Sequence, residues 1–346
     1  MKALLVVLLA LAGNAVMATA QSGPADGSFS FAVLGHVRGN KVGDLNPKLP
    51  ELLDRVRALQ PDFVVLTGDM IWGEVDKDPV DTTAVLKEWH ELDSALATLG
   101  VPVYRVPGNH DISDIPSRDI YFRLYGEPPD AFDYEGNRFL LLASAWIPED
   151  GDLRHNPFIR TRKLSAVQTD WLRQQLSDTT AYQNAFVFMH HLLWWEPDTS
   201  QWWREVHPVL AAGGVDAVFS GDYGPMKFSE LKRDGVHYLQ SSMEGNPTLG
   251  VLHAFESSRM LSSQFDNFFF VTVNGDSVGV EVKTLAEFSS NHFTPEKYRA
   301  VTSPDSEEKT LVGRVRRMVT PKRAVAGLLI LGAGLVLGFV AGRKRS

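Results

Sequence analysis

The stretch Arg105-Val-Pro-Gly-Asn-His-Asp-Ile112 decides how the rest of the chain is interpreted. It carries a strand-like run, residues 101–106, directly into a turn that holds Asn109, His110 and Asp111. An Asn carbonyl is a neutral oxygen ligand for a hard metal ion, and a His beside an Asp is suited to moving a proton. The same turn is compatible with a purely structural role, so its meaning depends on loops elsewhere in the chain.

The sequence before this stretch alternates short apolar runs with helical spacing. Residues 30–34 and 63–67 are apolar, as buried parallel strands are. Apolar side chains recur at helical spacing over residues 50–60, and residues 81–100 have the pattern of a capped amphipathic helix. With a third strand at residues 103–106, this order is typical of a layered α/β domain whose ligand site lies at the carboxyl ends of the strands.

The chain after this stretch is expected to extend the same domain. Asn274-Gly275, between two alternating segments, is a strong signal for a β-hairpin. Four tryptophans between residues 194 and 203 form either a lid or substrate wall, or a cluster that packs over a core edge. The expected helices are residues 118–125 and 165–176, and the expected strands are residues 132–134, 138–144, 185–189, 215–220 and the hairpin 267–283.

Five of the expected strands end in polar loops. Packing alone does not explain polar side chains at five strand ends, so we expect the loops to gather on one edge of a sheet. The loops are Gly35-His36-Val-Arg38, Gly68-Asp69, Gly108-Asn109-His110-Asp111, His190-His191 and Gly221-Asp222-Tyr-Gly224.

The order and spacing of these loops resemble the calcineurin-like metallophosphoesterase family, whose motifs read GDxH, GDxx, GNHD or GNHE, H and GHxH. The resemblance covers residues 29 to about 285. It implies an α/β (α+β layered) fold of two packed mixed β-sheets flanked by helices. It also implies a hydrolase that cleaves phosphate esters with a metal-bound water, in which paired ions activate the water and neutralise the phosphate.

The resemblance implies one metal site that keeps its ligands. Asp69 takes the place of the Asp that bridges two metals in the family, and Asn109 and His190 match two further ligands. Asp222 stands where the first His of the fifth motif would be. An Asp can ligate the same ions, so this site retains four ligands with a harder oxygen character.

The partner metal site departs from the family at three positions. His36 replaces an Asp, and Arg38 and Gly224 each replace a His. Gly224 has no side chain, and the guanidinium of Arg38 stays protonated and repels a cation. His36 is equally compatible with metal ligation and with a hydrogen-bonded loop histidine. We therefore expect a divalent transition metal (Mn, Fe or Zn), with one ion rather than two.

The substitution at Arg38 leads to a specific hypothesis. We expect Arg38 to occupy the volume of the missing metal, to pair with Asp69 and to present its guanidinium to a phosphate. His110, oriented by Asp111, is expected to protonate the leaving oxygen. The alternative is a catalytically inactive module that binds a phosphorylated envelope ligand or partner.

Composition sets further bounds. The chain has 346 residues, of which 44% are hydrophobic, enough for one large domain or two small ones. It contains no Cys, which excludes disulfides, thiolate metal ligands and a Cys nucleophile.

Both ends of the chain carry targeting patterns. Residues 1–20 combine Lys2, an apolar run and a small-x-small site at Ala18-Thr-Ala20, as secretory signals do; a buried N-terminal helix is the alternative. Residues 324–342 are nineteen residues without a charge, enough to span a bilayer, and a basic tail, residues 343–346, follows.

These patterns predict an exported, membrane-anchored protein. The phosphoesterase domain, residues 21–285, would be periplasmic or extracellular, joined to the span by a polar and then basic stalk, residues 286–323. The span also resembles sorting tails that bacterial envelope enzymes remove, in which case the anchor is transient. Gly334, Gly338 and Gly342 share a helical face and either mediate dimerisation or are ordinary small residues of the span.

The charge balance argues against nucleic acid as a partner. Of the 34 basic residues, ten lie in residues 1–20 and 309–346, which leaves 24 basic against 42 acidic residues elsewhere. Such an acidic domain repels nucleic acid, so a nuclease is disfavoured. The expected partner is a phosphorylated small molecule or envelope substrate.

Overall fold

The computed structural model describes residues 27–73, 80–146, 163–222, 227–243 and 265–285, and the backbone of 261–263. All of these lie in one compact unit, Met1–Ala286. The predicted signal, stalk and span, and also Tyr223 and Gly224, lie outside the described residues. Within the described part of the chain, no helix is both long and apolar enough to cross a lipid bilayer.

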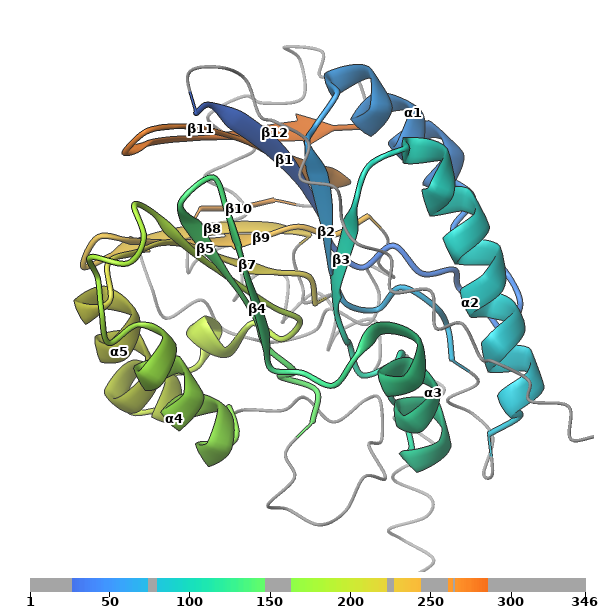
Figure 1. The fold of residues 1–346 in the computed structure, drawn as a ribbon. Coiled ribbons are helices and arrows are strands. Elements are labelled where there is room, and N and C mark those ends of the chain that lie inside the picture. Colours follow the sequence, from blue (N-terminus) through green and yellow to red (C-terminus); the bar gives the residue numbers. More distant parts are fainter. Residues whose placement is uncertain are drawn as a thin grey trace, which may run out of the picture. The chain divides into compact units, whose positions relative to one another are not determined.

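The first sheet has five strands in the order β12-β11-β1-β2-β3 (Figure 1). The parallel strands β1 (Phe29–Leu34), β2 (Phe63–Thr67) and β3 (Val103–Val106) form one half. The hairpin β11 (Asn267–Asn274) and β12 (Ser277–Thr284) adds antiparallel strands beside β1, which confirms the hairpin predicted at Asn274-Gly275. Parallel pairing places the carboxyl ends of β1, β2 and β3 at the same edge.

The second sheet has seven strands in the order β10-β8-β9-β7-β6-β5-β4. Its parallel part brings the ends of β6 and β7 together. Three of its strands, β8, β9 and β10, were not predicted from the sequence. The strands are β4 (Asp130–Tyr134), β5 (Asn137–Leu141), β6 (Ala185–Met189), β7 (Val215–Ser220), β8 (Phe228–Arg233), β9 (Val236–Gln240) and β10 (Leu261–Ser263).

The two sheets pack face to face through a layer of phenylalanines. Phe31 of β1 lies 5.3 Å from Phe186 of β6, and Phe63 of β2 lies 5.2 Å from Phe139 of β5, measured between ring centroids. All four rings are buried. Edge-to-face contacts of this kind add to the burial of apolar surface, so this layer fixes the position of one sheet on the other.

Helices cover the outer faces of both sheets. The helices α1 (Leu49–Leu59), α2 (Thr82–Leu96) and α3 (Ile115–Tyr125) share a core cluster with the five-stranded sheet. The helices α4 (Ala166–Gln175) and α5 (His207–Ala212) share another with the seven-stranded sheet (Figure 1). The predicted fold of two mixed sheets flanked by helices is therefore confirmed.

The polar loops and the tryptophan segment differ from the simplest expectation from the sequence. The polar loops do not leave one edge of one sheet: β1, β2 and β3 belong to the first sheet, whereas β6 and β7 belong to the second. The tryptophan segment is not a lid, because Trp194, Trp202 and Trp203 are buried in the core behind the seven-stranded sheet. It contains a short 3-10 turn and a π-helical stretch that leads into α5.

Candidate metal centre

Main-chain hydrogen bonds join the polar loops in pairs. The N–H of His36 donates to Gly68 O at 3.2 Å, and the N–H of Arg38 donates to Asp69 O at 2.9 Å. In the second sheet, the N–H of Asp222 donates to His190 O at 2.8 Å. The side chains of these loops are therefore positioned by the strand ends themselves.

Close approach of the loops requires glycine next to the site. A Cβ on Gly108 would lie 2.3 Å from Oδ1 of Asp69, and one on Gly68 would lie 2.5 Å from Nδ1 of His190. His36 and Asp69 have φ angles of 48° and 51°, in the left-handed region that non-glycine residues seldom adopt. Such strained residues concentrate at functional sites, where surrounding contacts hold them.

The His190 ring presents one nitrogen to three oxygens. Its Nδ1 lies 2.9 Å from Thr67 O, so the N–H is at Nδ1 and the lone pair is at Nε2. Nε2 lies 3.1 Å from Oδ1 of Asn109, 3.3 Å from Oδ1 of Asp69 and 3.7 Å from Oδ1 of Asp222. All four side chains are buried. The four residues proposed from the sequence thus converge on Nε2 of His190.

This donor set fits a divalent metal ion. The lone pair of Nε2 and the three oxygens that it faces repel unless a cation or proton lies between them. Ligands about 2.1 Å from one ion stand about 3.0 Å apart at octahedral angles and about 3.4 Å apart at tetrahedral ones, which brackets most of the separations above. A metal-bound His also usually donates its other N–H to a carbonyl, as His190 does to Thr67.

Asp69, His190 and Asp222 are not by themselves arranged to hold an ion: the described residues contain no such group of three or more His, Cys, Asp or Glu side chains. The carbonyl of Asn109, 3.1 Å from Nε2 of His190, is the fourth donor of the set.

The second oxygen of Asp69 faces different partners. Oδ2 lies 3.4 Å from Nδ1 of His36, 3.5 Å from Nε of Arg38 and 4.0 Å from Nε2 of His110. The expected pairing of Arg38 with Asp69 is thus observed. Two rings and a guanidinium surround the oxygen that would bridge to a second ion.

Burial and neighbouring charges shift the pKa values of Asp69 and His36. Burial alone would raise the pKa of Asp69, but the positive potential of His190, His110, His36 and Arg38 outweighs it and holds that pKa well below its usual range. Burial, assisted by the Arg38 charge, lowers the pKa of His36 well below its ordinary value. Arg38 is therefore the fixed positive charge beside the Asp69 carboxylate.

The expected role of Asp111 is corrected. Its carboxylate does not orient the His110 ring: Oδ1 accepts the N–H groups of Met70 and Ile71, and Oδ2 accepts that of Gly108. Asp111 therefore fastens two loops to each other. A short side chain that leaves the turn towards these main-chain donors cannot also reach the ring.

His110 is oriented by a main-chain carbonyl instead. Its Nδ1 lies 2.8 Å from Trp72 O, which places the N–H at Nδ1 and leaves Nε2 to exchange protons. Burial lowers the pKa of His110. No pattern in the sequence pointed to Trp72, because a main-chain acceptor has no residue signature.

The family profile described as calcineurin-like phosphoesterase matches residues 42–223, more than half of the chain. The chain belongs to this family. The match begins after the first polar loop, the loop in which His36 and Arg38 replace the residues of the family motif.

Known members of the family extend the comparison. The serine/threonine-protein phosphatase CPPED1 of Pongo abelii is 29% identical over 199 residues, covering 53% of this chain and 55% of the relative. Its counterpart from Homo sapiens is 28% identical over the same length, with the same coverage. The chain therefore spans about half the length of the curated relatives it matches.

Two solved structures show the same fold. A dimetal phosphatase from Danio rerio superposes with a TM-score of 0.52 at 16% identity, covering 75% of this chain and 97% of that one. Purple acid phosphatase PPD1 from yellow lupin (Lupinus luteus) gives 0.53 at 13% identity, covering 77% and 53%. At these identities the likeness concerns the arrangement of sheets and helices.

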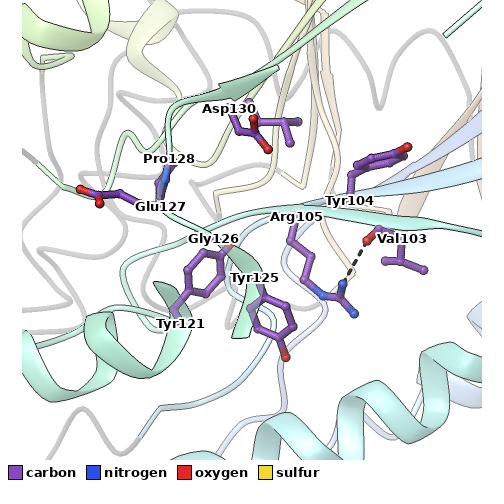
Figure 2. Close-up of a pocket in the computed structure, with 10 residues that line it drawn as sticks. Val103, Tyr104, Arg105, Tyr121, Tyr125, Gly126, Glu127, Pro128 and Asp130 are labelled. Atoms are coloured by element: carbon purple, nitrogen blue, oxygen red, sulfur yellow. Dashed lines mark hydrogen bonds between the residues drawn. The ribbon is translucent and has the colours of Figure 1, made fainter. Parts of the chain in front are cut away.

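One cavity lies apart from the cluster of polar side chains described above, which consists of His36, Arg38, Asp69, Asn109, His110, His190 and Asp222. It has a volume of about 200 Å³ and lies at the start of β3, between the edge strands of the two sheets and the end of α3 (Figure 2). Arg105 in its wall stacks on Tyr125, with Cζ 4.6 Å from the ring centroid, and donates to Val103 O and Asp93. None of the cluster residues lines this cavity.

Proposed function

We propose that this protein is a metal-dependent phosphoesterase that works with one divalent ion rather than two. The observation that carries the proposal is Nε2 of His190, which faces oxygens of Asn109, Asp69 and Asp222 at 3.1 to 3.7 Å. Family membership supports the reaction class, hydrolysis of a phosphate ester.

These four residues would hold the ion. One nitrogen and three oxygens form a donor set suited to Mn, Fe or Zn. When bound, such an ion lowers the pKa of a water molecule and draws negative charge from phosphoryl oxygens.

Arg38 and His110 would serve the substrate itself. The guanidinium of Arg38 can hydrogen-bond phosphoryl oxygens and offset part of the charge that a second ion would neutralise. In the cationic form of His110 both ring nitrogens carry a proton, and Trp72 O accepts the one at Nδ1. Nε2 gives its proton to the leaving oxygen as the ester P–O bond breaks. Water forms the new P–O bond, and the proton that this water releases returns to Nε2. The products are an alcohol and inorganic phosphate.

A second candidate, a binding module without turnover, is favoured by one observation. His36, Arg38 and His110 surround Oδ2 of Asp69, where a second ion would bind in the family. The same residues that bind a phosphoryl group would then hold a phosphorylated ligand without cleaving it.

Metal analysis combined with an activity assay tests the proposal. We expect the purified protein to bind about one Mn, Fe or Zn ion per chain and to hydrolyse p-nitrophenyl phosphate. His190→Ala should lose both the ion and the activity. His237→Gln, which changes a histidine paired with Glu230 on the far strands, should keep both. A wild-type protein that binds phosphate but hydrolyses nothing, with or without an ion, supports the binding module, and a protein that neither hydrolyses the ester nor binds phosphate overturns both.

Location and partners remain part of the proposal. The apolar and basic patterns of residues 1–20 and 324–346 support export and anchoring in the cytoplasmic membrane, with a periplasmic or extracellular domain. A phosphorylated small molecule or envelope component is then the accessible substrate. Cell fractionation of a tagged chain checks this: recovery in the cytoplasmic soluble fraction contradicts it.

A further inference from the structure

Trp72 lies between the two residues proposed to act on the substrate. The Arg38 guanidinium lies over its ring, with Cζ 4.6 Å from the ring centroid. The Trp72 carbonyl oxygen lies 2.8 Å from Nδ1 of His110, and the two rings are 5.1 Å apart between centroids. A single residue therefore contacts both the charged group and the proton-exchanging group.

The segment that carries Trp72 is fixed on both sides. The N–H groups of Met70 and Ile71 donate to Asp111, and the N–H of Gly73 donates to Glu88 at 2.9 Å. Both carboxylates are buried. Because these bonds hold the main chain before and after position 72, they fix the position of the Trp72 carbonyl and of the Cα from which the ring extends.

Three contacts determine which edge of the Arg38 guanidinium is available to an anion. Nε lies 3.5 Å from Oδ2 of Asp69, and Nη1 donates to Gly39 O at 2.8 Å. Cζ of Arg38 lies over the ring of Trp72. The remaining Nη2 edge is then held in one direction, which lowers the entropy lost when an anion binds.

We propose that Trp72 is a positioning residue, which orients Arg38 for a phosphoryl group through its ring and keeps the His110 N–H at Nδ1 through its carbonyl. This inference rests on the proposed phosphoesterase function. It adds a residue that is not one of the proposed ion ligands and acts through two neighbours.

The test measures binding of inorganic phosphate to the Mn-loaded full chain by calorimetry, beside KM and kcat for p-nitrophenyl phosphate. Trp72→Leu removes the ring and keeps the carbonyl. We expect phosphate to bind about 2- to 30-fold more weakly, the range that a partly desolvated cation–π contact supports. KM should rise by a similar factor, while bound Mn and the shape of the kcat–pH profile stay unchanged because the His110 contact is retained.

Two further variants isolate the route of the effect. Tyr125→Leu removes an Arg–aromatic contact of the same 4.6 Å geometry around Arg105, outside the cluster, and should leave phosphate affinity unchanged (Figure 2). In an Arg38→Met background, Trp72→Leu should cause no further loss, because the guanidinium it positions is absent.

The outcomes separate this inference from the proposed function. A wild-type protein that binds neither Mn nor phosphate removes the proposed function. Wild-type binding together with wild-type affinity in Trp72→Leu, or an equal loss in the Arg38→Met background, overturns the role of Trp72 alone. If Trp72→Leu does not fold, Trp72→Phe is measured instead: its smaller ring should weaken phosphate binding at least about twofold, and unchanged affinity rejects the inference.

Discussion

Nε of Arg38 lies 3.5 Å from Oδ2 of Asp69, while Oδ1 of the same carboxylate faces Nε2 of His190 at 3.3 Å. Asp69 thus stands between a fixed positive charge and a set of metal donors. The resemblance to the family implies that the corresponding carboxylate bridges two ions in its two-metal members. In the single-ion site that we propose, the guanidinium takes one of those two places, which leads to the following predictions.

Restoring the family ligands should restore the second ion. Arg38→His removes the guanidinium, and Gly224→His supplies the second His of the fifth motif. We expect bound metal, measured by elemental analysis, to rise from about one ion towards two per chain, because a cation no longer meets a fixed positive charge. Gly224→His alone serves as the control and should stay at one ion. A double variant that also stays at one ion contradicts this account of Arg38.

Removing the guanidinium alone should weaken phosphate binding. In Arg38→Met we expect inorganic phosphate to bind about 10- to 100-fold more weakly, the range for losing a charge-assisted hydrogen bond. Bound metal should not fall, because Arg38 is not a ligand. Arg38→Lys keeps the charge without the planar fork and should recover only part of the affinity. Equal affinity in all three proteins would show that Arg38 does not contact the anion.

Asp111 should prove to be structural. In Asp111→Asn one carboxylate oxygen becomes an NH2 group, which opposes a buried main-chain N–H of Met70, Ile71 or Gly108. We expect a loss of about 2–3 kcal/mol in the free energy of unfolding, measured by urea denaturation. Asp114→Asn, which changes a helix cap that accepts one N–H, should cost less than about 1 kcal/mol. Unchanged stability with lost activity would instead return Asp111 to a direct catalytic role.

Asp216 should make stability depend on pH. Burial raises the pKa of this half-buried carboxyl, which accepts the N–H of Ala185 at 3.0 Å. The folded state therefore holds the proton more tightly than the unfolded state, so the stability that Asp216 contributes is present below its unfolded pKa and lost as pH rises through its folded pKa. Asp216→Asn should be more stable than wild type at pH 7, and this difference should vanish towards pH 3.

An opposite control checks the sign of this prediction. Hydrogen bonds from Thr180 lower the pKa of the exposed Asp178. Asp178→Asn should therefore be no more stable than wild type at pH 7, with any difference fading as pH falls through the folded pKa. Urea midpoints of both variants from pH 3 to pH 8 provide the measurement. Parallel curves for Asp216→Asn and wild type would show that burial does not perturb Asp216.

The alternation of apolar runs and helical spacing in the sequence was sufficient for most of the fold. Strands such as Phe63–Thr67 and Ala185–Met189 match their predicted bounds, because a fully buried strand must be apolar throughout. The short strands Phe228–Arg233 and Val236–Gln240 were missed because polar residues interrupt their apolar pattern. The two strands pair with each other in the sheet, a contact that the sequence pattern did not reveal. The sequence pattern also did not predict that the polar loops follow strands of two different sheets.

The sequence by itself determined the residue types of the site. Asp69, Asn109, His190 and Asp222 each follow the end of a strand, where polar residues succeed an apolar run. Only the tertiary structure decided which atoms meet. It set Thr67 O against Nδ1 of His190, gave Asp111 to main-chain donors, and put Trp72 between Arg38 and His110. These contacts join segments that lie far apart along the chain. Local periodicity specifies what each segment becomes, but the direction of a loop side chain depends on the segments that pack beside it.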